Sequence, residues 1–552
     1  MFFFIFVASA VALVLGYIFY GRFMAKKYNL CNANETPAER LNDGMDYCPT
    51  HPAVVLGHHF SSIAGAGPIV GPITAASMFG WLPTLLWCIF GSIFIGGPHD
   101  FGAVISSMRH DGKSVGEVID HWIGHRGKLY FLIFTILSLF LVVAVFLVLT
   151  TATFVTDPVV AFVSCMYIFL ALISGLLIYR FNVNLKAVTF VMLGIIAVCS
   201  IWGGDWPFVT AFFTHSADQW NIFLAIYIGL ASILPVWLLL QPRDYLASYF
   251  LYFAVAIGAV GMILGSSLNS GAVPAVASNI NWFGFTRTDL WPMLFVIVAC
   301  GAVSGFHSLV GSGTTSKQLA HEADAMPVGY GAMLLEGLVA VIALGTMMVA
   351  GGIQKGGPVG TFAAGFGQFC TLLHIDPVLG TRLGAIAING FLLTSLDTAT
   401  RLARYQIQEL TDYKVSKYPA TLIPVLVALV LVYFKTTAPD GKIVPAWAVI
   451  WPVFGASNQL VAALAILGVA MWIIRGLKKK ATFLLIPFWF MLATSMAGLV
   501  VEIKATLTSG HPNYILAGIS FLLLAIALMM TWEGVSALNR DKKEALLSPA
   551  ED

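Results

Sequence analysis

Residues 57–80 read GHHFSSIAGAGPIVGPITAASMFG, a stretch that is apolar enough for a bilayer but poorly suited to a continuous helix. Three glycines and two prolines fall within the eight positions from Gly65 to Pro72. Glycine in a helix interior costs about 1 kcal/mol relative to alanine, and proline costs about 3 kcal/mol. At membrane depth, a broken backbone persists only where protein or a water-filled cavity satisfies its polar groups. The stretch therefore predicts a discontinuous helix at a midplane binding site, an arrangement typical of secondary transporters.

The composition of the chain places this stretch in an all-α polytopic membrane protein. Of its 552 residues, 59% are hydrophobic and 10% are charged, and the mean hydropathy is +0.87. Soluble domains carry about 25% charged residues, so the composition excludes a long soluble protein. Apolar runs of roughly 18 or more residues are long enough to span a bilayer. They predict about fifteen transmembrane helices, at residues 2–21, 58–80, 82–106, 129–155, 158–180, 186–204, 219–240, 245–267, 290–313, 328–351, 379–403, 418–434, 445–473, 481–501 and 513–532.

The positions of the basic residues orient these predicted helices. With fifteen spans, most of the 29 Lys and Arg residues fall in the odd-numbered loops and the C-terminal tail. Cytoplasmic loops carry an excess of such residues, so the sequence predicts an N-terminus outside and a C-terminus inside. The six basic residues predicted on the outer side are Arg287, Lys355, Arg382, Lys435, Lys442 and Lys504.

A second stretch of the chain resembles the first. FSSIAGAG at 60–67 aligns with FHSLVGSG at 306–313, and the apolar runs that follow keep roughly the same offset. Each block contains five runs, and two extra runs lie between the blocks, so the second block enters the membrane in the opposite orientation. This pattern predicts a LeuT-like fold with two inverted five-helix repeats and extra helices. The predicted divisions are 1–57 (N-terminal helix and cytoplasmic loop), 58–204 (first repeat), 205–289 (two inserted helices and outer loop), 290–475 (second repeat) and 476–552 (two C-terminal helices and tail).

Two broken helices would offer free backbone groups and helix ends to a small ligand. The N-terminus of a half-helix carries partial positive charge, which suits a carboxylate. For the glycines, close helix packing is the alternative role, and for each histidine a satisfied polar role is the alternative to a charge switch. The predicted substrate-binding residues are His59, Ser61, Ser62, Gly65 and Gly67 in the first stretch and His307, Ser308, Gly311 and Gly313 in the second.

Three carboxylates within predicted spans, Asp100, Glu336 and Asp397, are candidates for coupling transport to an ion. Ionisable groups are costly inside a membrane and mark ion or proton pathways, and a carboxylate there could carry a proton. The alternative is a structural pair with Arg401, Arg404 or a histidine.

Hydroxyl groups near Asp397 keep sodium coupling open as well. Thr394, Ser395 and Thr398 could ligate Na⁺ together with carbonyls of the first broken helix, or they could bond back to their own helix. The neighbours Arg243 and Asp244 could pair as a gate or cap a turn. The segment at 451–459 favours packing over substrate contact.

Six longer motifs along the chain resemble one known family. The motifs are GHHFSSIAGAGPIVGP at 57–72, HDFGAVISSMRHDGKSVGE at 99–117, LPVWLLLQPRDYL at 234–246, CGAVSGFHSLVGSGTTSKQLAHE at 300–322, LTSLDTATRLARYQIQE at 393–409 and WPVFGASNQL at 451–460. They are similar to the carbon starvation (CstA) family over about residues 17–475. The resemblance implies a bacterial inner-membrane transporter of peptides or pyruvate, with proton symport and kinship to LeuT-like proteins.

The sequence therefore predicts a secondary active transporter that imports a small carboxylate-bearing nutrient, peptides or pyruvate, by proton symport through alternating access. A Na⁺-coupled amino-acid or peptide transporter and an uncoupled channel or sensor are the alternatives. The expected partners are the substrate, H⁺ or Na⁺ and the lipid bilayer, and no nucleic acid is expected. No enzyme activity, cofactor or metal is expected, since neither a nucleophile–base pair nor a ligand set at metal spacing stands out.

Overall fold

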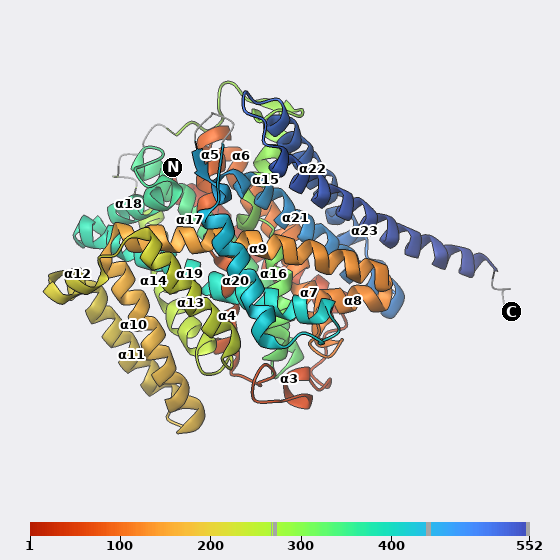
Figure 1. Ribbon diagram of the computed structural model, residues 1–552, viewed down its shortest axis with the longest axis horizontal. Helices are drawn as coiled ribbons and strands as arrows, with labels where there is room; N and C mark the ends of the chain where they lie inside the picture. Colours follow the sequence, from red (N-terminus) through yellow and green to blue (C-terminus); the bar gives the residue numbers. More distant parts are fainter. Residues whose placement is uncertain (266–267, 269–272, 438–442, 548–552) are drawn as a thin grey trace.

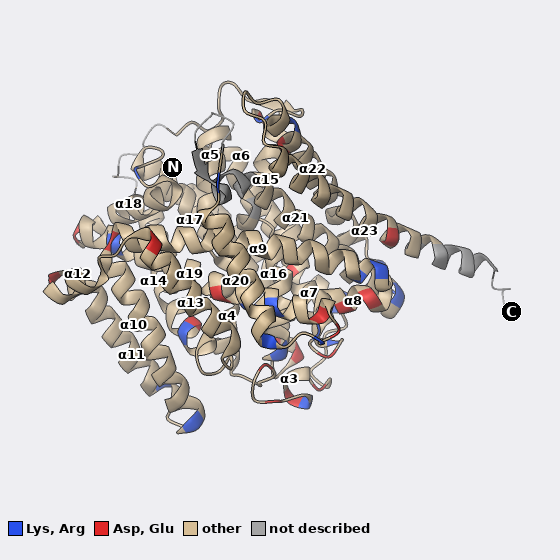
Figure 2. Ribbon diagram, in the orientation of Figure 1, with Lys and Arg blue, Asp and Glu red and all other residues tan. Residues whose placement is uncertain are grey.

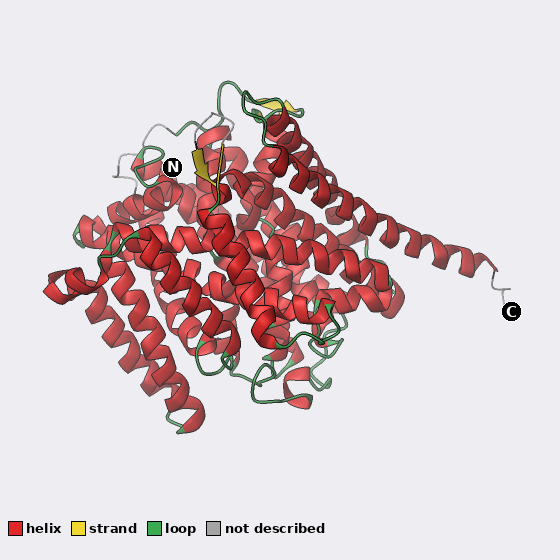
Figure 3. Ribbon diagram, viewed as in Figure 1, coloured by secondary structure: helices red, strands yellow, loops and turns green. Residues whose placement is uncertain are grey.

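The computed structural model describes residues 1–265, 268, 273–437 and 443–547, which form a bundle of helices with short strands at one end (Figures 1 and 3). The all-α polytopic prediction is confirmed. The last residues of the predicted run 245–267 and the predicted outer residue Lys442 lie outside the described residues.

The first half of the chain follows the predicted runs closely. Here η marks a short 3₁₀ or π segment. The elements are α1 (Phe2–Leu15), η1 (Gly16–Gly21), α2 (Arg22–Lys27), α3 (Pro37–Arg40), α4 (Pro52–Ala64), α5 (Gly67–Phe79), α6 (Trp81–Gly91), η2 (Ser92–Gly96), α7 (Gly97–Met108), α8 (Val115–Trp122), α9 (His125–Thr156), α10 (Pro158–Gly175), η3 (Leu176–Arg180), α11 (Leu185–Trp202), η4 (Gly203–Asp205), α12 (Pro207–Phe213), α13 (Ala217–Ile233) and α14 (Leu240–Leu264).

The second half contains the short strands, of which β2 and β3 pair in antiparallel fashion. Its elements are β1 (Asn281–Phe283), α15 (Leu290–Val298), η6 (Ala299–Gly301), α16 (Gly305–Gly313), η7 (Thr315–Lys317), η8 (Glu322–Asp324), η9 (Met326–Gly331), α17 (Ala332–Ala350), α18 (Gly357–Thr371), α19 (Pro377–Leu410), α20 (Lys417–Tyr433), β2 (Lys435–Thr437), β3 (Ile443–Pro445), α21 (Ala446–Met471), η10 (Trp472–Gly476), α22 (Thr482–Leu507) and α23 (Tyr514–Leu547).

Every predicted run coincides with helix, although not every helix is long. Among the described residues, twelve helices are long and apolar enough to cross a membrane. The remaining three predicted runs correspond to α13 and α20, with 17 residues each, and to the divided pair α15 and α16. The number of spans and the five-helix repeats therefore stay predictions.

Helix α18 is the longest of the described helices that lie outside the predicted runs. The segment between Gly351 and Leu379 was expected to be a loop, but it contains α18, which packs against α17 and α19. Phe362, Phe366 and Phe369 lie on one buried face of this helix, since they follow the spacing of helical turns. Its polar residues and glycines keep the run below the apolarity of a membrane span, so hydropathy alone misses it.

The first predicted break is confirmed. Helix α4 ends at Ala64 and α5 begins at Gly67, with Pro68 in its first turn. Gly65 joins them with a φ of +43°, a left-handed value that favours glycine. A Cβ at this position would also lie 2.9 Å from Ser395 Oγ, so the junction is closely packed against α19.

The predicted break does not lie at Gly311, which is helical, and α16 ends at Gly313. The second helix is instead interrupted upstream, between Val298 at the end of α15 and Gly305 at the start of α16. A Cβ on Gly311 would lie 3.0 Å from Val104 Cγ2, and one on Gly313 would lie 2.3 Å from a Leu402 methyl carbon. These two glycines therefore serve close helix packing, the alternative that the sequence left open.

Charged residues are unevenly distributed over the bundle. Figure 2 shows most Lys and Arg residues at the end where α3 and α8 lie, opposite the end with the β-strands. Helix α4 starts from the first end and α16 returns to it, whereas α5 and α15 extend to the other end (Figure 1). The two broken helices thus run in opposite directions through the bundle, as the sequence predicts.

Candidate transport site

The two helix breaks lie against each other in the interior of the bundle. Helix α4 packs against α16, and α5 packs against α15 and η6. A Cβ on Gly67 would lie only 2.1 Å from Cys300 Cβ, and one on Gly71 would lie 2.3 Å from the Val298 carbonyl oxygen. Residues 67 and 71 must therefore be glycine for the two breaks to meet.

Asn458 of α21 holds the second break open. Its Oδ1 accepts a hydrogen bond from the Phe306 backbone N–H at 3.0 Å, and its Nδ2 donates to Ser304 Oγ at 3.0 Å. This side chain satisfies an orphan donor in the first turn of α16, as a capping residue does. The packing role that the sequence favours for residues 451–459 stays a prediction, since Phe454 and Gly455 of this segment also line a cavity.

Five buried residues surround the first break and are called here the arginine cluster: His58, Tyr227, Arg243, Asp244 and Asp397. The Arg243 guanidinium contacts both carboxylates, donating from Nε to Asp244 Oδ1 at 2.9 Å and from Nη2 to Asp397 Oδ1 at 3.1 Å. Tyr227 OH donates to Asp397 Oδ2 at 2.8 Å, and His58 Nδ1 lies 2.6 Å from Asp244 Oδ2. One permanent cation therefore serves two carboxylates.

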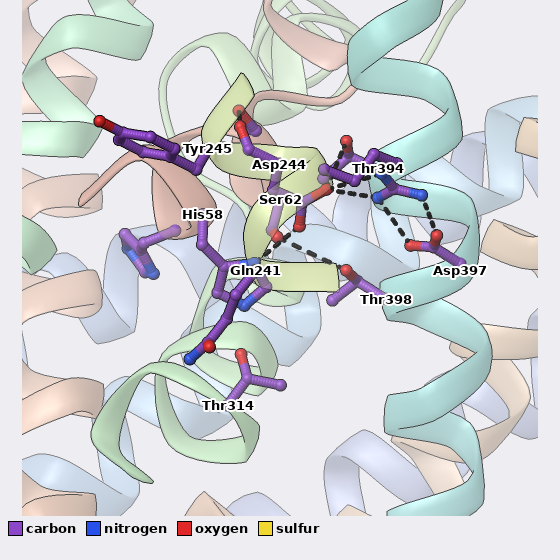
Figure 4. Close-up of polar contacts among 12 residues, drawn as sticks. His58, Ser62, Gln241, Asp244, Tyr245, Thr314, Thr394, Asp397 and Thr398 are labelled. Carbon is purple, nitrogen blue, oxygen red and sulfur yellow. Dashed lines mark hydrogen bonds and ion pairs between the residues drawn. The ribbon is translucent and has the colours of Figure 1, made fainter. Parts of the chain in front are cut away.

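The α19 hydroxyls predicted to bind an ion face this cluster and the end of α4. Figure 4 shows Ser62 between Asp244 and Thr398. Thr394 Oγ1 donates to Asp244 Oδ1 at 3.0 Å, and Ser395 Oγ donates to the Ser62 carbonyl at 3.0 Å. Thr398 Oγ1 lies 3.4 Å from Ser62 Oγ. All three contacts leave α19, so the alternative in which these hydroxyls bond to their own helix does not describe them.

Four further residues near the second break form what we call the histidine cluster: His99, Asp100, His307 and Glu336. Asp100 Oδ1 lies 2.6 Å from His99 Nδ1, and its Oδ2 lies 2.8 Å from His307 Nδ1. The other ring nitrogen of His307 lies 3.3 Å from Glu336 Oε2. All four side chains are buried, and neither Glu336 oxygen has a hydrogen-bond partner among the described residues. No Lys or Arg ion pair with these two carboxylates occurs among the described residues.

The remaining predicted polar residues contact three different partners. His59 Nδ1 lies 2.7 Å from Thr315 Oγ1, so His58 and His59 point from α4 toward different partners. Ser61 Oγ donates to the Asp244 carbonyl at 3.3 Å. Ser308 Oγ donates to the Gly305 carbonyl of its own helix at 2.7 Å.

For Asp397, the alternative of a structural ion pair fits the structure, but its partner is Arg243 and not one of the arginines that the sequence suggested. Arg401 and Arg404 were the candidates, but Arg401 donates to the Ala231 carbonyl at 2.6 Å and Asp397 pairs with Arg243. One helical turn separates Asp397 from Arg401, and Arg401 also contacts Asp46 in the loop before α4. The sequence did not place Tyr227 or His58 in this cluster. The feature that could have identified them is a polar side chain within an apolar run.

The loop before α4 lies outside the candidate spans, at the end of the site where α3 lies. Asp46 Oδ1 lies 3.3 Å from Arg401 Nη1 and also accepts from Tyr405 OH. Lys317 Nζ lies 4.5 Å from the Tyr405 ring centroid. Burial raises the pKa of Asp46, but the charges of Arg401, Lys317 and Arg404 outweigh burial and lower it overall. Burial lowers the pKa of Lys317.

Two cavities lie on the side of the breaks away from this loop. The smaller, of about 200 Å³, reaches Gly67 and Cys300, where the two breaks meet. The larger, of about 910 Å³, lies between α9, α18 and α19 and includes the ion pair between Asp157 and Arg382 at 2.9 Å. Among the described ranges, no group of three or more His, Cys, Asp or Glu residues could hold a metal ion.

The chain is similar to known proteins along most of its length. The family model described as Carbon starvation protein CstA matches residues 1–353 and 348–498. The peptide transporter CstA of Campylobacter jejuni is 31% identical, with 90% of this chain and 80% of the relative covered. The pyruvate/proton symporter BtsT of Escherichia coli is 30% identical, with 89% of this chain and 80% of the relative covered.

Solved structures add a weaker likeness. A manganese transporter from Eremococcus coleocola is 12% identical, with 91% of this chain and 99% of that chain covered, at a TM-score of 0.47.

Proposed function

Because this chain belongs to the carbon starvation protein CstA family, we propose that it is a secondary active transporter that imports a small carboxylate-bearing nutrient by proton symport. Pyruvate and short peptides are the substrate candidates, since the relatives are named as a peptide transporter and a pyruvate/proton symporter. We propose transport rather than catalysis, in a bacterial inner membrane, with the N-terminus outside and the C-terminus in the cytoplasm. The bilayer, the substrate and the proton are the proposed partners.

The observation that carries this proposal is the histidine cluster. Asp100 and Glu336 are buried together, and the groups that contact them are histidines. An isolated buried charge costs several kcal/mol or more, so buried charges are neutralised or paired. Here the neutralising charge comes from protons on His307 or on Glu336. A conformation that admits water to the cluster would change its proton count, which is the requirement for coupling.

The substrate is proposed to bind where the two breaks meet. Helices α5 and α16 both begin there, and the helix dipoles at their N-termini favour a bound carboxylate. The proposed contacts are His59, Ser61, Ser62, Gly65, Gly67, His307 and Ser308. Gly311 and Gly313 are not among the proposed substrate contacts, because both belong to α16 and pack closely against neighbouring side chains.

Sodium coupling is the second candidate, and one observation favours it. Ser395 and Thr398 of α19 converge on Ser62, whose carbonyl oxygen lies close to the end of α4. Hydroxyl and carbonyl oxygens are suitable ligands for a hard cation. A Na⁺ ion at this position would bridge the proposed repeats 58–204 and 290–475.

Uptake into proteoliposomes tests the proposal and separates these candidates. Labelled pyruvate and a labelled dipeptide are each offered under an inward proton gradient, an inward sodium gradient, both gradients and neither. The expected result is accumulation of one substrate under the proton gradient and its loss when a protonophore is added. Accumulation under the sodium gradient alone assigns the second candidate. Uptake that is indifferent to both gradients overturns symport.

A further inference from the structure

The cavity of about 200 Å³ beside the breaks extends outward to a buried acidic residue on α22. Its walls come from α5, α15, α21 and α22. Cys300 and Gly67 line it where the breaks meet, and Arg287 and Glu502 line it as well. Helix α22 belongs to neither proposed repeat, so it brings a carboxylate to the site from outside the repeated core.

Glu502 is built into this cavity rather than into the surface. Its side chain is 1% exposed, whereas that of Arg287 is 47% exposed. Glu502 Oε2 accepts a hydrogen bond from Arg287 Nη2 at 2.8 Å. Glu502 Oε1 is buried without a hydrogen-bond partner among the described residues. Buried polar atoms are normally satisfied, so an unsatisfied carboxylate oxygen at a cavity requires an explanation.

The inner end of the cavity approaches the histidine cluster. Gly301, which follows Cys300, accepts a hydrogen bond from Ser92 Oγ at 3.4 Å. A Cβ on Gly301 would lie 3.3 Å from Ala340 Cβ, and one on Gly337 would lie 2.6 Å from the same Ser92 Oγ. The second break therefore packs on the turn of α17 that carries Glu336. The cavity has room for several water molecules between Glu502 and Cys300, the residue before Gly301.

We propose that Glu502 is the outer proton port of the transporter, with Arg287 as its cover. This inference rests on the proposed proton symport. A proton from outside water binds Glu502 Oε1 and forms the neutral acid, which releases Arg287 toward the solvent. The acid then gives the proton to water in the cavity, which delivers it to Glu336, and Glu502 returns to its ion pair. The steps move one proton and no electrons.

Few charges compete with this carboxylate. Helix α22 packs against α15, α21 and α23. Arg287, in the segment before α15, is the charged residue that contacts Glu502 within the part of the chain that the structure describes. Protonation of Glu502 therefore leaves Arg287 without its partner, which couples the outer pH to the position of the cover.

Substitution of Glu502 by glutamine tests the port, because glutamine can still accept from Arg287 but cannot take up a proton. The proton-driven uptake of the Glu502→Gln variant is expected to fall about tenfold or more, the scale of a lost proton-transfer group. Its dependence on outer pH is expected to flatten, while exchange of labelled for unlabelled substrate at equal pH continues. Glu502→Asp keeps a titratable group and should restore the pH dependence. Asp218→Asn, at an exposed outer acid on α13, is the matched control and should leave the pH profile unchanged.

The outcomes separate this inference from the function on which it rests. A wild-type protein without proton-driven uptake overturns the proposed symport. Proton-driven uptake with the same pH profile in the wild type and in Glu502→Gln overturns the port alone. If Glu502→Gln does not fold, Thr74→Ile narrows the cavity without touching the carboxylate. That variant should slow proton-driven uptake but not equal-pH exchange, and equal slowing of both contradicts the port.

Discussion

The arginine cluster and the histidine cluster solve the same problem with different chemistry. Each holds two carboxylates that are fully buried beside a broken helix. In the arginine cluster, one guanidinium contacts both Asp244 and Asp397. In the histidine cluster, the ion-pair partners of Asp100 and Glu336 among the described residues are imidazoles.

This difference separates a structural site from one that can exchange protons. A guanidinium keeps its charge at all accessible pH values, so the arginine cluster always holds one cation between its two carboxylates. An imidazole changes charge near neutral pH, so the histidine cluster can hold different numbers of protons. The comparison teaches that a buried acid is a better candidate for coupling when its partner also titrates.

The largest effect is expected when the permanent charge is removed. Arg243→Gln leaves two buried carboxylates without their cation, and breaking a buried ion pair in this way costs about 3–5 kcal/mol. We expect a large loss of thermal stability in detergent, measured as the shift in Tm. Arg243→Lys is the matched control, since it keeps the charge and loses the planar fork. A Tm for Arg243→Gln equal to that of the wild type would remove the distinction between the clusters.

Substitution in the histidine cluster should impair proton-driven uptake rather than stability. We expect Asp100→Asn to fold but to lose proton-driven uptake by about tenfold or more, because the cluster can no longer change its proton count. Equal-pH exchange and proton-driven uptake are measured side by side. Asp397→Asn is the comparison variant, and its uptake should keep the wild-type dependence on the proton gradient. Loss of that dependence in Asp397→Asn, and not in Asp100→Asn, would exchange the roles of the two clusters.

A smaller effect is expected at the hydroxyls of α19. Ser395→Ala removes one hydrogen bond to the Ser62 carbonyl, which contributes about 1 kcal/mol to stability. We expect a modest fall in Tm and no change in the response to sodium. Thr400→Val is the control, because Thr400 bonds to the Leu396 carbonyl of its own helix. A sodium response that is present in the wild type and absent only in Ser395→Ala would favour the second candidate function.

The smallest effect is expected at Asp46, an acid in the loop before α4 that is paired with arginine and not fully buried. Its folded-state pKa is lowered, so its contribution is present above the unfolded pKa and is lost as pH falls through the folded pKa. Asp46→Asn should therefore lower stability at pH 7 by about 1 kcal/mol or less. The Tm difference from the wild type should shrink below about pH 4. A difference that grows in acid would contradict this sign.

The sequence predicts the first break well and the second poorly, for a physical reason. Glycine and proline between Gly65 and Pro72 disfavour a helix by themselves, so local propensity locates that break. The second depends on Asn458, a side chain far away in the sequence, which caps α16 at the Ser304–Phe306 turn. The similarity of FSSIAGAG to FHSLVGSG shows which helices correspond. It does not predict that the second helix breaks at the equivalent position.

The candidate site shows the same division. Asp100, Glu336 and Asp397 could be selected from the sequence because a carboxylate in an apolar run is unusual. Their partners could not be selected, since Arg243 and Asp397 meet only through the packing of α14 against α19. Helix α18 escaped prediction because it combines a buried aromatic face with polar residues.

The neighbouring histidines of α4 have a mechanical consequence. His58 contacts Asp244 of α14, and His59 contacts Thr315 of η7. Helix α4, which ends before Gly65, is therefore held by contacts with two different elements. If α4 rotates about Gly65, the contacts of His58 and His59 break in the same movement. The contacts of α4 with α14 and with η7 would then be lost together. Such coupling keeps a carrier from being open to both sides of the membrane at the same time.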